Sequence, residues 1–72
     1  MAYTALMDED SARWLAGLDE PEGITHLGNG KVRFSKSAYA YLRNVPSHMD
    51  GHIDSHDRVC LSEGSYQLTR SR

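Results

Sequence analysis

Residues 24–35 read ITHLGNGKVRFS, in which an Asn29-Gly30 pair separates two runs of alternating apolar and polar residues. Asn-Gly is typical of a type I′ turn, because that turn needs a positive φ at both central positions. The pattern therefore predicts a β-hairpin with this pair at its tip. Four side chains would share its apolar face, in the cross-strand pairs Leu27–Val32 and Thr25–Phe34.

The predicted hairpin leads directly into a helix. Ser35 is a favourable N-cap residue, because its hydroxyl can accept a hydrogen bond from a free backbone N–H in the first turn. Phe34 and Tyr39 have the spacing of a hydrophobic staple, and Pro46 prevents the helix from continuing. The sequence predicts a helix over residues 36–43.

A second amphipathic helix is predicted over residues 9–18. Asp8 can cap its N-terminus, and Trp14, Leu15 and Leu18 recur at the spacing of one helix face. We expect Trp14 to lie in the core. If it is exposed instead, it becomes a candidate interface anchor, because tryptophan is enriched at binding hot spots.

The C-terminal third predicts another hairpin, over residues 58–69. With Glu63-Gly64 as the turn, the pairs would be Leu61–Tyr66 and Val59–Leu68, with all four side chains on one face. The preceding segment, 46–57, contains Gly51 and many Asp and Ser residues. We expect an ordered loop there, with one or two helical turns.

The predicted fold class is α+β, with the order α-ββ-α-ββ. Both hairpins would join one antiparallel sheet, with the helices packed on one face. Residues 1–72 would form a single small domain, with frayed ends at 1–7 and 70–72. A lone Cys60 excludes an internal disulfide, and the sequence lacks a basic, apolar leader and a long apolar run. We therefore expect a cytoplasmic protein without membrane contact.

Charge is segregated along the chain. Residues 1–23 carry six acids and one base, whereas residues 24–47 carry four bases and no acid. Either segment is a candidate docking face; the alternative is that the two segments complement each other within the fold or across a dimer. The candidate acidic face comprises Asp8, Glu9, Asp10, Asp19 and Glu20. The candidate basic face comprises Lys31, Arg33, Lys36 and Arg43.

Two chemical alternatives follow from other patterns. The basic segment 24–43 contains Phe34, Tyr39 and Tyr41, so it offers charges for phosphates and rings for base stacking. A metal site is the second alternative, because zinc ligands recur every four residues at His48, His52, His56 and Cys60. One helical stripe cannot surround a tetrahedral ion, and no catalytic set or phosphate-binding loop is present. We therefore expect neither an enzyme nor a bound cofactor.

The sequence favours a small protein-binding module that acts as a regulator or inhibitor by docking on a protein partner or on a second copy. A chain of 72 residues buries little core, which makes association favourable. Its length, acidic front and lack of catalytic residues are typical of accessory proteins encoded by phages and mobile elements. Nucleic-acid binding through residues 24–43 and metal binding remain the alternatives.

Overall fold

The computed structural model describes residues 2–71, which form two helices and seven strands. The elements are β1 (Ala2–Leu6), α1 (Glu9–Ala16), β2 (Ile24–Gly28), β3 (Lys31–Ser35), α2 (Lys36–Arg43), β4 (His52–Ile53), β5 (Arg58–Leu61), β6 (Gly64–Gln67) and β7 (Thr69–Ser71). One antiparallel sheet has the order β2-β3-β1-β7 and the other has the order β4-β5-β6. The predicted α+β class is confirmed, with two sheets where one was expected.

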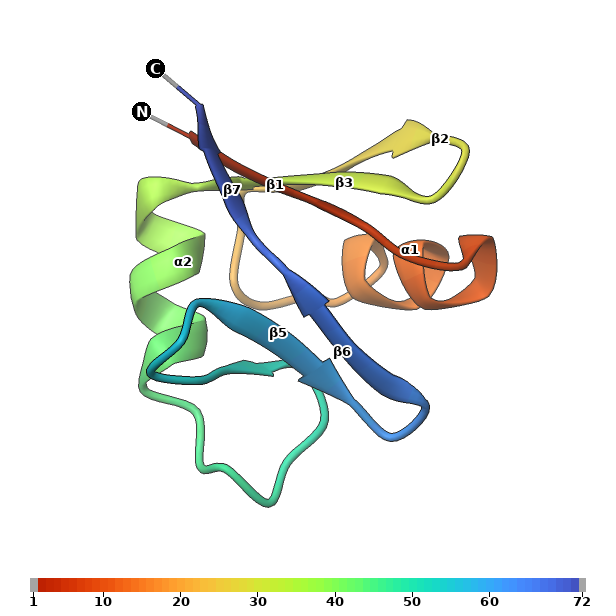
Figure 1. Cartoon of the computed structure of the whole chain (residues 1–72). Helices are drawn as coiled ribbons and strands as arrows, with labels where there is room; N and C mark the ends of the chain where they lie inside the picture. The colour runs from red at the N-terminus through yellow and green to blue at the C-terminus, as the bar shows by residue number, and fades with distance from the viewer. Residues whose placement is uncertain (1, 72) are drawn as a thin grey trace.

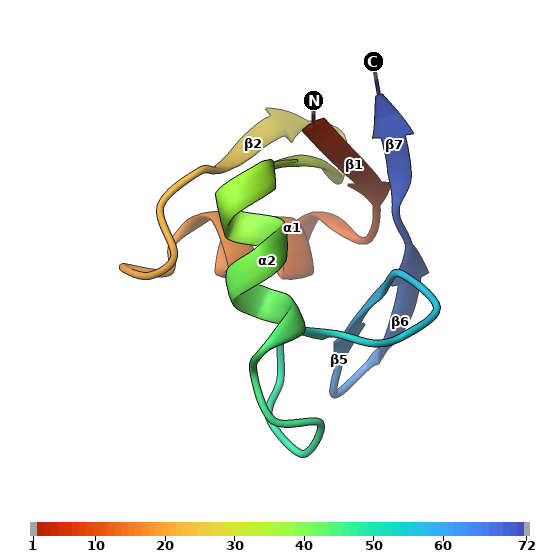
Figure 2. The same ribbon diagram turned by 90° about the vertical axis from the view of Figure 1, so that its left-hand side faces the viewer.

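Both helices lie on one face of the four-stranded sheet, with the three-stranded sheet beyond them (Figure 1). Viewed from the side of α2, this helix runs from the end of β3 toward the second sheet (Figure 2). Strands β6 and β7 are separated only by Leu68, which is buried. This last segment therefore passes from one sheet to the other and ties the two together.

The Asn-Gly turn forms as predicted, but one strand is displaced. Asn29 and Gly30 have φ values of 55° and 78°, and Gly28 pairs with Lys31. A bulge at Leu27 then shifts the register by one residue. Because side chains alternate along a strand, the shift turns Leu27 toward solvent instead of the core. The predicted pairs Leu27–Val32 and Thr25–Phe34 are therefore wrong.

The predicted frayed N-terminus instead forms one of the two central strands of the larger sheet. Strand β1 pairs with β3 on one side and with β7 on the other, and Tyr3 and Ala5 are buried. The Tyr3 ring stacks on that of Tyr39 from α2, with centroids 4.0 Å apart. The prediction failed because both partners of this strand are distant in sequence. Residues 70 and 71 also pair in the sheet, while residues 1 and 72 lie outside the described range.

The second hairpin has its predicted apolar face in a different register. Val59 pairs with Tyr66 and Leu61 with Gly64, so the turn is formed by residues 62–63. The observed pairing differs from the predicted pairing by two residues. Because side chains alternate with a period of two along a strand, each one stays on its predicted face. Segment 46–57 is a loop interrupted by the short strand β4, and it contains turns but no helix.

The core lies between the helices and the two sheets. Its largest fully buried side chains are Phe34, Leu15, Val32 and Val59. Helix α1 turns Ser11, Ala12 and Leu15 inward, which leaves Trp14 47% exposed. The prediction that Trp14 lies in the core is therefore wrong. The predicted face contained Trp14, Leu15 and Leu18. The buried face begins nearer to the N-terminus of α1, at Ser11 and Ala12, where small side chains bring the helix close to the sheet.

Candidate functional site

Three of the largest exposed apolar side chains line one groove of about 460 Å³. Trp14 is 47% exposed, Tyr41 47% and Met49 51%, and they come from α1, α2 and the following loop. Leu18 and Val45 complete its apolar wall. Exposed apolar side chains gathered in one place make this groove a candidate interaction surface.

Trp14 is oriented by its local structure. Asp8 caps α1 by accepting from the Ser11 N–H at 3.0 Å and from the Ser11 hydroxyl at 2.7 Å. Gly51 packs against the six-membered ring of the indole, since a Cβ at that position would be 3.5 Å from its Cζ3 atom. Because this contact already restricts the exposed ring, binding through it would cost less side-chain entropy.

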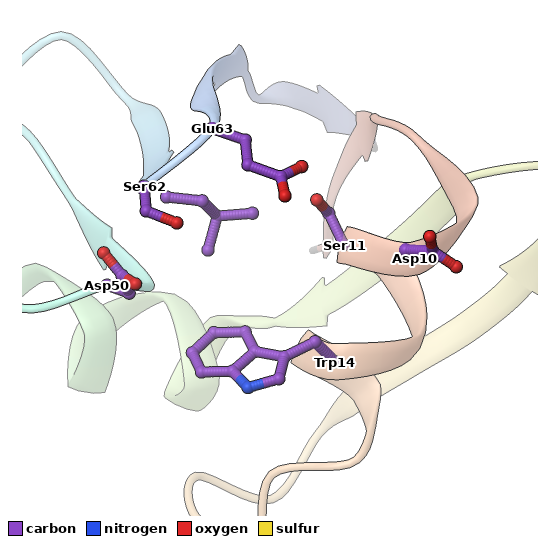
Figure 3. Close-up of a pocket in the computed structure, with 7 residues that line it drawn as sticks. Asp10, Ser11, Trp14, Asp50, Ser62 and Glu63 are labelled. Atoms are coloured by element: carbon purple, nitrogen blue, oxygen red, sulfur yellow. The ribbon is translucent and has the colours of Figure 1, made fainter.

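Two further hollows extend the groove. One, of about 270 Å³, lies on the other side of Trp14 and includes Asp10, Asp50 and Glu63 (Figure 3). The other, of about 360 Å³, lies beyond Tyr41. Trp14 and Asp50 are shared by the first hollow and the groove, while Glu20 and Tyr41 are shared by the second hollow and the groove. We call this continuous surface the Trp14 groove. It is defined by Asp10, Trp14, Asp19, Glu20, Glu22, Tyr41, Met49, Asp50 and Glu63.

The acidic residues of the chain fall into two groups. Four make ion pairs or side-chain hydrogen bonds within the fold: Asp8, Glu9, Asp54 and Asp57. The side chains of the other six accept no hydrogen bond and form no ion pair within residues 2–71: Asp10, Asp19, Glu20, Glu22, Asp50 and Glu63. All six of these line the Trp14 groove. Its negative charge therefore has no counter-charge inside the described structure.

The structure divides the acidic face predicted from sequence. Asp8 and Glu9 make internal contacts: Asp8 caps α1, and Glu9 accepts from the Gly30 N–H at 2.6 Å while bonding to His26 at 2.9 Å. The bond to His26 is the main cause that lowers the pKa of Glu9. Asp10, Asp19 and Glu20 lie in the Trp14 groove, where they are exposed.

The predicted basic face is also divided. Lys31 and Arg33 alternate with the buried Val32 and Phe34, so they lie on the sheet face opposite the helices. Arg43 pairs with Asp57 at 3.3 Å, at the far end of α2 from Lys36. Phe34 is fully buried. Tyr39 packs on Tyr3 and donates its hydroxyl to Asp57, and the Arg43 guanidinium lies over its ring, 5.9 Å from the centroid. Tyr39 is therefore held within the fold beside one of the four bases, while Tyr41 lines the Trp14 groove.

The four residues of the predicted metal site do not form one ligand set. His52 bonds to the Met49 carbonyl at 2.8 Å and pairs across the strands with Cys60, whose thiol lies 3.7 Å from Asp54. His48 lies in the Trp14 groove, while the exposed His56 belongs to the turn before β5. Across residues 2–71, no group of three or more His, Cys, Asp or Glu side chains is placed to hold a metal ion.

Sequence reasoning missed the contribution of residues distant from α1. Asp50 and Glu63 come from a segment whose charges are nearly balanced, so they gave no signal. Their isolation follows from the pairing of the other acids there, since Arg58 bonds to Asp54 at 3.0 Å and Arg43 to Asp57. The i, i+4 spacing of Asp54 and Arg58 is the one local sign of this pairing.

No protein-family model, curated protein or solved structure matches this chain. Among the helices of residues 2–71, none has the length and apolar character needed to cross a membrane. The function must therefore be argued from the Trp14 groove itself.

Proposed function

We propose that this protein is a non-enzymatic module that regulates or inhibits a partner protein by docking the Trp14 groove on a basic, partly apolar surface. One observation carries the proposal: the carboxylates without an internal counter-charge surround the exposed rings of Trp14 and Tyr41. Unpaired charge and exposed apolar area each have a simple use in binding, and here they occupy the same surface.

Trp14 supports the proposal as the central anchor. Tryptophan is enriched among the residues that dominate binding energy, especially where neighbouring side chains exclude water around it. Tyr41 and Met49 flank it in the groove. Replacing a hot-spot residue with alanine costs about 2 kcal/mol or more, so Trp14→Ala should weaken partner binding by roughly thirtyfold.

The carboxylates define the chemistry of the partner. Six acids without internal partners repel an acidic surface and attract a basic one. Such rim charges act mainly on the rate of association and on its salt dependence. A module of this kind covers the basic surface of its partner, which is how it would regulate or inhibit that protein.

Self-association is the second candidate. The unpaired Lys31 and Arg33 of one copy could meet the Trp14 groove of another, because they lie on a different surface of the molecule. Such a contact joins a patch on one copy to a different patch on the next. Its repetition produces an open filament of copies, unless the rotation between neighbouring copies closes the assembly into a ring. A different protein satisfies the groove without this consequence, and we favour it.

The proposal is tested by capture from a lysate of the source cells with three immobilised proteins. Trp14→Ala removes the anchor, and Leu27→Ala is the matched control, because Leu27 is 49% exposed on β2. We expect a nuclease-resistant protein partner that the wild type and Leu27→Ala retain and that Trp14→Ala loses. Equal capture by all three proteins, or recovery of nucleic acid alone, would contradict the proposal.

A further inference from the structure

We propose that the hollow beside Trp14 is a subsite for one arginine side chain of the partner. This inference rests on the proposed docking function and adds the identity of the side chain recognised. Its walls differ in kind: an indole on one side, carboxylates and hydroxyls on the others, and the partly buried Leu61 between them. That combination suits a flat cation with an aliphatic stem.

The positions of the polar groups agree with this ligand. In Figure 3 the Glu63 carboxylate faces across the hollow from the indole of Trp14, while Asp50 and Ser62 lie on a third side. The carboxylate of Asp10 points away from the indole, at the rim. A guanidinium placed against the indole would therefore meet carboxylates at its edge, where its N–H groups point.

Ser11 gives a second, independent indication. Its side chain lines the hollow although the residue is only 8% exposed. The hydroxyl donates its proton to Asp8 at 2.7 Å, so toward the hollow it can only accept a hydrogen bond. A ligand group that hydrogen-bonds to this hydroxyl must therefore be a donor, and a guanidinium offers five N–H donors.

A metal ion fits this hollow less well. Calcium requires six to eight oxygen ligands at about 2.3–2.6 Å. Within residues 2–71, the carboxylates of this hollow do not form a group of three that could hold an ion. Groups too far apart for one ion can still be bridged by a planar guanidinium, whose donors point in different directions. Lysine carries a compact charge and bridges them less well.

The test uses the one indole N–H signal of the chain, since Trp14 is its single tryptophan. Three acetylated and amidated tripeptides, Gly-Arg-Gly, Gly-Lys-Gly and Gly-citrulline-Gly, are titrated into ¹⁵N-labelled protein at millimolar concentrations and constant ionic strength. Citrulline keeps the shape of arginine without its charge. We expect saturable shifts of the indole signal with the arginine peptide, weaker binding of the lysine peptide by roughly threefold or more, and none of the citrulline peptide.

Two variants locate the binding. Asp50→Asn with Glu63→Gln should weaken the arginine peptide by roughly fivefold or more, because both charge-assisted contacts are lost. Lys31→Gln is the control: it removes one exposed charge on the sheet face opposite the helices, outside the Trp14 groove, and should change binding by less than about twofold. The side chains of Asp50 and Glu63 make no hydrogen bond or ion pair within residues 2–71, so the double variant should fold as the wild type does.

Equal binding of the arginine and citrulline peptides, equal binding of arginine and lysine, or an unchanged affinity of the double variant would each overturn the subsite. These results are independent of partner capture, which needs no arginine in this hollow. Loss of the subsite with retained, Trp14-dependent capture would leave the docking proposal standing, whereas failure of capture alone would leave the peptide result intact.

Discussion

Replacing Gly30 with alanine should destabilise the fold more than the same change two residues earlier. Gly30 has a φ of 78°, where an alanine costs about 1–2 kcal/mol. A Cβ at this position would also lie 1.9 Å from the carbonyl oxygen of Met7. Relieving that overlap means moving the turn away from the residues between β1 and α1.

The second cost comes from the hydrogen bond that such a movement breaks. The Met7 N–H donates to the Gly30 carbonyl at 2.9 Å, and a lost bond of this kind costs about 1 kcal/mol. Gly30→Ala should therefore cost about 2–3 kcal/mol in all. Gly28 is the matched control, because its φ is 93° but a Cβ there would meet no atom within 4 Å. Gly28→Ala should cost only about 1–2 kcal/mol.

Thermal unfolding followed by circular dichroism measures the difference. In a domain of this size, 1 kcal/mol corresponds to roughly 4–8 °C in Tm, so Gly30→Ala should melt about 4–8 °C below Gly28→Ala. Equal melting temperatures for the two variants would refute the inference that Gly30 joins the hairpin turn to the segment after β1.

Three other predictions concern the remainder of the fold. The hydrogen bond from the Arg58 backbone N–H is the main cause that lowers the pKa of Asp54 to about 2. The ionised Asp54 therefore stabilises the fold above pH 3.8, and this stabilisation is lost as the pH falls toward 2. Asp54→Asn should flatten that part of a pH-dependent unfolding curve, and an unchanged curve would argue against this role. Burial raises the pKa of the Cys60 thiol, so iodoacetamide at pH 8 should alkylate the native protein more slowly than the urea-unfolded protein, and equal rates would contradict this. Leu15→Ala should cost about 2–5 kcal/mol in urea unfolding and Trp14→Ala clearly less, because only Leu15 is fully buried; the reverse order would return Trp14 to the core.

The sequence was most informative where the determining interactions are local. The Asn29-Gly30 turn, the Ser35 cap and the extent of α2 were each predicted correctly, because each depends on residues within a few positions. Ser35 accepts from the Ala38 N–H at 3.1 Å, as its position before the helix indicated. The Asp8 cap of α1 was predicted for the same reason.

Errors arose where a distant segment determines the result. Strand β1 has no local signal, because its pairing depends on β3 and β7. Alternation alone predicted a pairing of β2 with β3 that differs by one residue from the observed pairing, because it gave no sign of the bulge at Leu27. Trp14 and Leu15 are neighbours on one helix, and only the approach of α1 to the sheet decides that Leu15 is buried and Trp14 exposed.

The candidate site was half predictable for the same reason. The acidic front of the chain identified Asp10, Asp19 and Glu20, whereas Asp50 and Glu63 join them only through folding. Which acids remain without a partner depends on ion pairs between elements, such as Arg43 with Asp57. Net charge along a sequence therefore indicates a candidate docking face, and the tertiary pairing of charges shows which of its acids remain unpaired.

The most direct test of the docking face is a chemical-shift map of ¹⁵N-labelled protein bound to its unlabelled captured partner. The account predicts changes at the Trp14 indole and at the amides of Tyr41 and Met49, with little change at Lys31 and Arg33. Changes concentrated at Lys31 and Arg33, with an unaffected indole signal, would contradict it and place the docking face on the bare side of the four-stranded sheet.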